Sequence, residues 1–235
     1  MSKKITFTID GVDIECQAGQ TILEAADAAG VYIPRLCYHN DLRAHGSCRV
    51  CTVMVNGRPQ AACTQPAADG IVVENTTDEV MENRKLLIEM LFVEGNHYCM
   101  FCEKSGNCEL QALAYRFGIA APRFPFLFPD RQVDASHPDI FIDRNRCVLC
   151  GRCVNASRDV DGKSVFEFVG RGPEKRVAVN AEAALGETQM DAADKAADVC
   201  PVGAILKKRV GYAVPVGQRL YDHKPIGSDI EEKQG

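Results

Sequence analysis

The stretch "CVLCGRC", residues 147–153, and the later pair "CP", residues 200–201, decide how this sequence is interpreted. The first stretch spaces three cysteines as C-x2-C-x2-C, and the second supplies a distant fourth sulfur. Three thiolates at this spacing can hold successive corners of a cube, which suits a [4Fe–4S] cluster. All-cysteine zinc sites are the alternative, but they normally present two separated C-x2-C pairs. We therefore predict one [4Fe–4S] site, with the ligands Cys147, Cys150, Cys153 and Cys200.

The composition of the whole chain agrees with a metal-rich soluble protein. The chain has 235 residues, 46% of them hydrophobic, a net charge of −5 and a pI near 5.6. The acidic pI argues against a nucleic-acid-binding protein. The start "MSKKITFTID" has no apolar signal region, and no apolar run approaches the roughly 18 residues of a membrane span. We expect a cytoplasmic protein, where 12 cysteines indicate metal or redox chemistry rather than disulfides.

A second group of cysteines lies in the first third of the chain. Its spacing is C-x10-C-x2-C-x11-C, with "GSCRVC" at the centre. Plant-type [2Fe–2S] sites share the C-x2-C core, with one cysteine before it and one later, although the first gap is longer here. On spacing alone, zinc remains open. The predicted [2Fe–2S] ligands are Cys37, Cys48, Cys51 and Cys63.

A third group occupies "GNHYCMFCEKSGNCELQ", residues 95–111. Cys99, Cys102 and Cys108 are spaced C-x2-C-x5-C, so a four-ligand site lacks one donor. Either the site is open at one corner, or His97 is the last ligand. His97 and Cys99 can both face one cluster only if the backbone between them is not helical.

Local patterns predict a small sheet wrapped around one helix at the N-terminus. Alternating residues 5–9 and 12–16 form a hairpin, and Thr21 and Glu24 form a capping box that opens a short helix. A second hairpin turns at Asn56-Gly57, and a strand follows near 70–75. The remaining cysteine, Cys16, is in phase with aliphatic neighbours, so we interpret it as a buried structural thiol.

The rest of the chain predicts short elements around the cysteines. Thr76 and Glu79 suggest a capping box for a helix over 77–93, with Val80, Leu87, Met90 and Leu91 on one face. Residues 109–117 look helical, and the proline-rich segment 119–139 is typical of an extended connector. The last expected elements are a strand at 140–143, a hairpin within 164–180 and a short helix within 190–200.

Three stretches together resemble a known family: "IPRLCYHNDLRAHGSCRVC", "EGNHYCMFCEKSGNCELQ" and "CVLCGRC" with "CPVGAI". They are similar to the N-terminal iron–sulfur region of the complex I electron-input subunit, of iron-only hydrogenases and of some NAD-linked formate dehydrogenases. The resemblance covers about residues 1–206. It implies an α+β chain with a β-grasp [2Fe–2S] ferredoxin domain, a small helical [4Fe–4S] domain with one histidine and three cysteine ligands, and a ferredoxin-like [4Fe–4S] domain. The expected bounds are 1–78, 79–118 and 140–207, with a linker at 119–139 and a docking tail at 208–235.

In that family the histidine commonly stands four residues before the first cysteine of the middle group, where this chain has Gly95. Assigning the role to His97 therefore assumes a shortened loop. With that assignment, the resemblance implies one [2Fe–2S] and two [4Fe–4S] clusters.

The segment "VGYAVPVGQRLYDHKPIGSDIE", residues 210–231, resembles the end of the small diaphorase subunits of cytoplasmic NAD-reducing [NiFe]-hydrogenases. This second resemblance implies an electron relay with two kinds of partner. One is a large diaphorase subunit that carries FMN and binds NAD. The other is a hydrogenase pair, a small and a large subunit, with a nickel–iron site.

The sequence shows no catalytic motif of its own. It has no glycine-rich dinucleotide loop after a strand, no nucleophile elbow and no Walker A motif. We interpret His39, His45, His137 and His223 as solvated or hydrogen-bonded. The chain is thus expected to be an enzyme only as a subunit of a hydrogen:NAD⁺ oxidoreductase. Two alternatives stay open: a relay subunit of an NAD-linked formate dehydrogenase or complex I-like enzyme, and a zinc-stapled scaffold.

Overall fold

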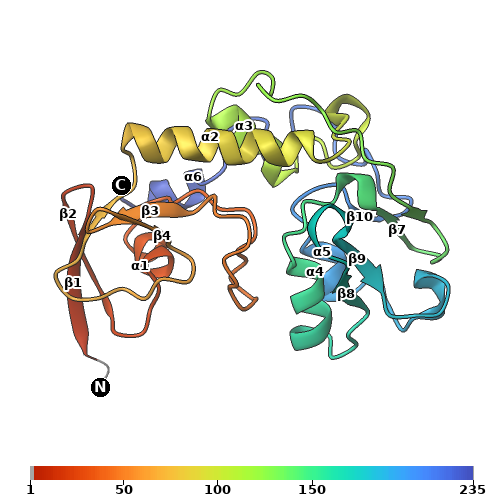
Figure 1. The fold of residues 1–235 in the computed structure, drawn as a ribbon, viewed down its shortest axis with the longest axis horizontal. Helices are drawn as coiled ribbons and strands as arrows, with labels where there is room; N and C mark the ends of the chain where they lie inside the picture. The colour runs from red at the N-terminus through yellow and green to blue at the C-terminus, as the bar shows by residue number, and fades with distance from the viewer. Residues whose placement is uncertain (1–2, 235) are drawn as a thin grey trace.

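The computed structural model describes residues 3–234, and its N-terminal part is a mixed sheet packed on one helix (Figure 1). The sheet has the order β2-β1-β5-β3-β4, with β1 and β5 parallel and the other neighbours antiparallel. This is the β-grasp arrangement expected from the sequence. Its elements are β1 Lys4–Ile9, β2 Val12–Gln17, α1 Ile22–Ala28, β3 Thr52–Val55, β4 Arg58–Ala61 and β5 Val72–Glu74.

The core of this domain follows from the alternation in the first hairpin. Phe7 and Ile14 are buried in one cluster with the apolar face of α1, and Cys16 lies in the same cluster at 7% exposure. Cys16 is therefore buried, as predicted. The predicted capping box is also present, because the Thr21 hydroxyl accepts from the Glu24 amide at 3.2 Å and the Glu24 carboxylate accepts from the Thr21 amide at 2.8 Å. Such a box satisfies two backbone donors that the helix itself cannot pair.

Helix α2 spans Asp78–Val93 and begins one residue later than predicted. The side chain of Thr77, not Thr76, accepts the backbone bond from Val80 at 3.3 Å, so the predicted Thr76–Glu79 capping box is wrong. The predicted apolar face is also wrong in part, since Met90 is 41% exposed while two polar side chains are buried. The buried positions of α2 are Val80, Arg84, Ile88, Glu89 and Val93.

The remaining elements build the middle and C-terminal parts of the chain. A three-stranded sheet has the order β10-β7-β6, and β8 and β9 form the predicted hairpin. In Figure 1 the two sheet-containing lobes lie side by side, with α2 and α3 along the top of the molecule. The elements are α3 Glu109–Arg116, β6 Val133–Asp134, β7 Ile140–Asp143, α4 Arg152–Asn155, β8 Phe166–Val169, β9 Arg176–Val179, α5 Lys195–Asp198, β10 Ile205–Lys207 and α6 Ser228–Glu231.

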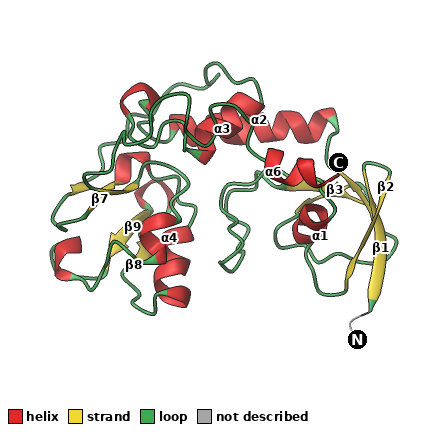
Figure 2. Cartoon of the chain, turned by 180° about the vertical axis from the view of Figure 1, so that it is seen from behind, coloured by secondary structure: helices red, strands yellow, loops and turns green. Residues whose placement is uncertain are grey.

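The C-terminal segment returns to the first lobe, where α6 lies near β3 and α1 (Figure 2). Ile226 and Ile230 are buried in the large core cluster that also contains Tyr32. The Arg116 guanidinium donates to the Ile226 carbonyl at 2.9 Å, which ties this segment to α3. The last part of the expected docking tail therefore packs on its own chain.

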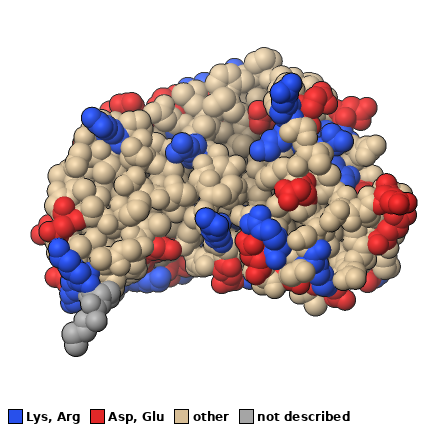
Figure 3. Space-filling view, turned by 60° about the horizontal axis from the view of Figure 1, so that its bottom comes forward, with Lys and Arg blue, Asp and Glu red and all other residues tan. Residues whose placement is uncertain are grey.

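The surface shows both signs of charge. On the face drawn in Figure 3, lysine and arginine alternate with aspartate and glutamate around uncharged areas. Over residues 3–234, no helix is long and apolar enough to cross a bilayer.

Candidate metal centres

The first cysteine group is assembled by the β3–β4 hairpin and the loop before it. Cys51 directly precedes β3 and Cys63 follows β4, so the pairing of Thr52 with Ala61 brings the two sulfurs together. On the preceding loop, the Cys37 amide donates to the Cys48 sulfur at 3.4 Å, and the Cys48 amide donates to the Cys37 sulfur at 3.5 Å. Amides that point at sulfur stabilise thiolates and tune the potential of a bound cluster.

The four thiols of this group shift one another's pKa values in opposite directions. Bonds from the Cys48 and Cys63 thiols lower the pKa of Cys37 to about 2, and a bond with Cys63 lowers the pKa of Cys51. The same contacts, together with burial, raise the pKa of Cys48 and of Cys63. Metal ligation requires thiolates, so cluster binding at this site would release protons from these thiols.

The middle group lines a separate cavity. The backbone runs without helix through His97 and Tyr98, and a 3₁₀ turn at Cys99–Phe101 then begins. This is the non-helical path that shared ligation by His97 and Cys99 requires. The structure therefore brings the predicted ligands to one cavity: His97, Cys99, Cys102 and Cys108.

His97 has the features expected of a metal ligand. Its Nε2 atom is buried and has no hydrogen-bond partner among the described residues. Burial lowers the pKa of His97 to about 4, opposed by the nearby Leu91 carbonyl, so the ring is neutral at pH 7. A histidine ligand is typically neutral and turns its other nitrogen toward a backbone carbonyl. The orphaned nitrogen fits a fourth ligand to an iron–sulfur cluster.

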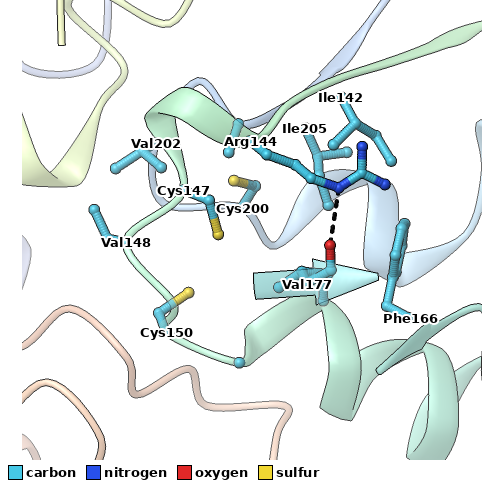
Figure 4. A pocket seen from close by; sticks show the side chains of 13 residues that line it. Ile142, Arg144, Cys147, Val148, Cys150, Phe166, Val177, Cys200, Val202 and Ile205 are labelled. Atoms are coloured by element: carbon cyan, nitrogen blue, oxygen red, sulfur yellow. Dashed lines mark hydrogen bonds between the residues drawn. The ribbon is translucent and has the colours of Figure 1, made fainter. Parts of the chain in front are cut away.

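The third group surrounds a largely apolar cavity (Figure 4). Cys147 ends a 3₁₀ turn, Cys153 lies in α4, and Cys200 follows α5. The sulfurs of Cys147, Cys150 and Cys200 face the same space. The apolar wall consists of Ile142, Val148, Phe166, Val177, Val202, Ala204 and Ile205.

The protonation of these thiols depends on what fills the cavity. Burial raises the pKa of Cys147 to about 11, and it also raises the pKa of Cys150 and Cys153. Metal ligation requires thiolates, so cluster binding at this site must release protons.

The cysteine spacing of the third group favours a cluster over a single zinc ion, because all-cysteine zinc sites normally present two separated C-x2-C pairs. Within residues 3–234, no three histidine, cysteine or acidic side chains are grouped closely enough to hold one metal ion. The donors of the middle and third groups border the two cavities described above. These residues fit inorganic clusters, which would supply one-electron transfer when bound.

Arg152 connects all three groups. Its guanidinium makes a bidentate pair with Glu109 at 2.6 Å, and Glu109 follows Cys108 of the middle group. It also donates to the carbonyl of Tyr38 at 2.7 Å, next to Cys37, and to that of Val199 at 3.4 Å, next to Cys200. Sequence reasoning missed this role, although the arginine stands inside the quoted "CVLCGRC" stretch.

Two glycines mark close approaches between the groups. Gly151 has φ +77°, and a Cβ there would lie 2.8 Å from the His45 ring, which belongs to the loop of the first group. A Cβ on Gly203 would lie 2.7 Å from the Cys102 sulfur of the middle group. A side chain at either position would collide with a residue of a neighbouring site, so both positions favour glycine.

The remaining histidines differ in environment. His137 is buried and contacts the Met190 carbonyl at 2.9 Å, and His223 contacts the Gly217 carbonyl at 2.6 Å on the surface. His39 accepts from the Asp41 amide at 3.2 Å, and Asn155 contacts the His45 ring at 3.4 Å. All four are hydrogen-bonded, as the sequence interpretation allowed.

Comparison with family models divides the chain into three iron–sulfur regions. Residues 2–78 match a 2Fe-2S iron-sulfur cluster binding domain, and residues 84–123 match an NADH-ubiquinone oxidoreductase-G iron-sulfur binding region. Residues 140–206 match a 4Fe-4S single cluster domain. The chain thus contains 2Fe-2S and 4Fe-4S binding domains.

Two relatives match most of the length of this chain. The chain is 45% identical over 223 residues to the NAD-reducing hydrogenase HoxS subunit gamma of Cupriavidus necator, covering 94% of this chain and 95% of that one. It is 34% identical over 209 residues to the mitochondrial NADH-ubiquinone oxidoreductase 78 kDa subunit of Candida albicans, covering 87% of this chain and 29% of that one. The chain therefore spans less than a third of this second relative.

A solved structure matches the entire fold. A chain in a crystal structure of NAD⁺-reducing [NiFe]-hydrogenase in the H₂-reduced state superposes with a TM-score of 0.94 at 47% identity, covering 98% of both chains. By its length, its three iron–sulfur regions and its fold, the chain belongs to the family of iron–sulfur gamma subunits of NAD-reducing hydrogenases.

Proposed function

We propose that this chain relays single electrons between a diaphorase subunit that binds FMN and NAD(H) and a [NiFe]-hydrogenase pair of small and large subunits. It would do so in the cytoplasm, through one [2Fe–2S] and two [4Fe–4S] clusters. The proposed domains are 1–78, 79–118 and 140–207, joined by the linker 119–139. The proposed ligand sets are the three groups assembled above, with His97 completing the middle one.

The observation that carries this proposal is the set of three separate sulfur sites in one chain, joined through Arg152. Arg152 contacts residues that are next to cysteines of all three sites. An electron that passes between the sites would therefore cross protein rather than solvent. No nucleophile or dinucleotide loop competes with this role in the sequence. The protein would therefore supply spacing and potential, and the clusters the chemistry.

The potentials of such clusters suit the proposed end points. A one-electron potential changes by about 59 mV for each tenfold change in proton concentration. The proton/hydrogen couple at pH 7 therefore lies at about −410 mV. Plant-type [2Fe–2S] centres lie near about −400 mV. Electrons could thus pass between NAD(H), these clusters and hydrogen without a steep uphill step.

Metal analysis of anaerobically purified protein tests the cofactor set. We expect a brown protein with about ten iron atoms per chain and an EPR signal after chemical reduction. A colourless protein with zinc and no paramagnetic signal would instead support the scaffold alternative. Co-purification with a nickel-containing heterodimer separates the hydrogenase role from a formate dehydrogenase or complex I-like role.

We further propose that the exposed part of the tail docks a partner subunit. Val216 is 81% exposed, and Tyr212 donates through its hydroxyl to the Phe101 carbonyl at 2.6 Å, beside the middle site. Met100 and Phe101 add exposed apolar surface next to it, at 84% and 73%. Exposed apolar patches of this kind mark interaction sites.

A pair of matched variants tests the docking role. Val216→Asp should leave the thermal unfolding midpoint unchanged while reducing recovery of the partner subunits in a pull-down. Ile226→Asp, at a position only 9% exposed, should lower the midpoint itself. Unchanged recovery with Val216→Asp would exclude this surface as the docking site.

A further inference from the structure

One short turn separates the two cysteine-lined cavities. The 3₁₀ turn Arg144–Arg146 follows β7 and leads directly into Cys147. Arg144 lines the third cavity, where its Nε donates to the Val177 carbonyl at 2.9 Å (Figure 4). Arg146, two residues later, lines the middle cavity instead. The turn therefore presents one guanidinium to each site.

Arg146 lies directly against a sulfur of the middle site. Its Nη1 is 3.7 Å from the Cys102 sulfur and 3.5 Å from the Gly203 carbonyl oxygen. Its Nε is 2.9 Å from the Asp143 carboxylate, and the two side chains are only 23% and 12% exposed. The carboxylate thus holds the far side of the guanidinium while one N–H remains directed at sulfur.

We propose that Arg146 sets the reduction potential of the middle cluster by donating a charge-assisted hydrogen bond to the Cys102 thiolate. Reduction adds one negative charge to a cluster, so a fixed cation and N–H donor at its sulfur stabilise the reduced form more than the oxidised form. Arg146 therefore raises the potential. Arg146 contacts the proposed ligand Cys102 and not the iron, so it acts on the cluster through that ligand.

The proposal rests on the proposed electron relay and adds a residue that the cysteine spacing does not reveal. Arg146 acts in the same direction as a neutral histidine ligand, which removes a negative charge from the cluster. Because Arg144 serves the other cavity, the two [4Fe–4S] potentials can be set separately by residues two positions apart.

EPR-monitored redox titration of the assembled complex tests the role of Arg146. Arg146→Gln should change the ratio of reduced to oxidised middle cluster about tenfold at a fixed potential, which is about 59 mV downward for one electron. The signal of the third cluster should not shift. Arg146→Lys, which keeps the charge but not the planar fork, should fall between Gln and the parent protein.

Asp143→Asn supplies a test with the opposite sign. It keeps the Oδ1 that accepts from the Asn145 amide at 3.0 Å but removes the charge that faces Arg146. The uncompensated guanidinium should then raise the potential of the middle cluster. If Arg146→Gln does not retain that cluster, the Asp143→Asn titration decides: an upward shift supports the proposal, and no shift overturns it.

Arg219→Gln is the matched control. Arg219 also pairs with an aspartate three residues away, Asp222, at 2.7 Å, and the side chains are 20% and 11% exposed. Its guanidinium donates to the Ser105 carbonyl at 3.3 Å, near the middle site but not at a sulfur. We expect no shift. Equal shifts for Arg146→Gln and Arg219→Gln, or equal shifts of both [4Fe–4S] clusters, would overturn the proposal, whereas a parent protein without cluster signals would contradict the proposed relay instead.

Discussion

At the scale of a residue, the environment of His97 suits the proposed role of a metal ligand. Burial lowers its pKa to about 4 and leaves Nε2 without a partner among the described residues, which would be costly if nothing bound there. Phe92 packs edge-on against the ring at 5.5 Å and restricts its orientation. The same logic applies to the buried thiols of the third site, whose raised pKa values favour the neutral form until iron binds.

Replacement of His97 by cysteine tests its ligand role. His97→Cys should keep the iron content but lower the potential of one cluster, on the order of 100 mV, because a thiolate adds negative charge. Redox titration with EPR detection measures this shift. His223→Cys, on the surface, is the control and should change nothing. Unchanged potentials for all clusters in His97→Cys would remove His97 from the ligand set.

At the scale of an element, α2 shows that a helix can be organised around a buried cation. Arg84 is 1% exposed and donates to the carbonyls of Val50, Thr52 and Asn75 and to the Asn75 side chain. These bonds attach the helix to the start of β3, which directly follows Cys51. Burial lowers the pKa of Arg84 to about 10, so the side chain is still charged at pH 7.

Loss of this arginine should detach α2 from the first domain. Arg84→Met leaves four buried acceptors without a donor and should cost about 3 kcal/mol. For a chain of this size that lowers the thermal unfolding midpoint by about 10 °C, measured on the iron-loaded protein. Lys85→Met, at the next and partly exposed position, should change it by no more than about 2 °C. Similar values for the two variants would contradict the proposed attachment.

The start and type of most elements could be predicted locally, whereas the buried face of α2 could not. The hairpins and α1 follow from period-2 alternation, from Asn56-Gly57 and from the Thr21 box, all of which act between near neighbours. In α2, the predicted apolar face did not include Arg84. This arginine is buried because carbonyls from two segments outside the helix, residues 50–52 and Asn75, converge on it.

At the scale of the whole molecule, Arg152 holds the three sulfur sites at constant separation. It is 3% exposed and bonds to segments more than 40 residues away on either side. Tunnelling between clusters depends on distance, so a hub of this kind supports electron transfer as well as stability. The loop of the first site reinforces it, since Ser47 donates to the Leu149 carbonyl at 3.4 Å.

Weakening the contacts of Arg152 should increase the mobility of the first domain but not of the third. Glu109→Gln leaves Arg152 without its charged partner and should destabilise the protein by about 3 kcal/mol. Hydrogen–deuterium exchange should increase in the loop from Cys37 to Cys48, which Arg152 contacts at Tyr38. Asp194→Asn breaks a 2.6 Å pair with Lys163 inside the third domain and should leave that loop protected. Equal exchange in both variants would contradict the hub.

The sequence by itself determined the division of the cysteines into three groups and most local elements, because cysteine spacing, turns and caps are properties of neighbouring residues. The ligand assignments and the docking role of the tail stay predictions. Only the tertiary structure decided that α6 packs beside α3 and that Arg84, Arg146 and Arg152 lie among the sites. Their partners come from segments far apart in the chain, and such contacts exist only once the backbone has closed around them.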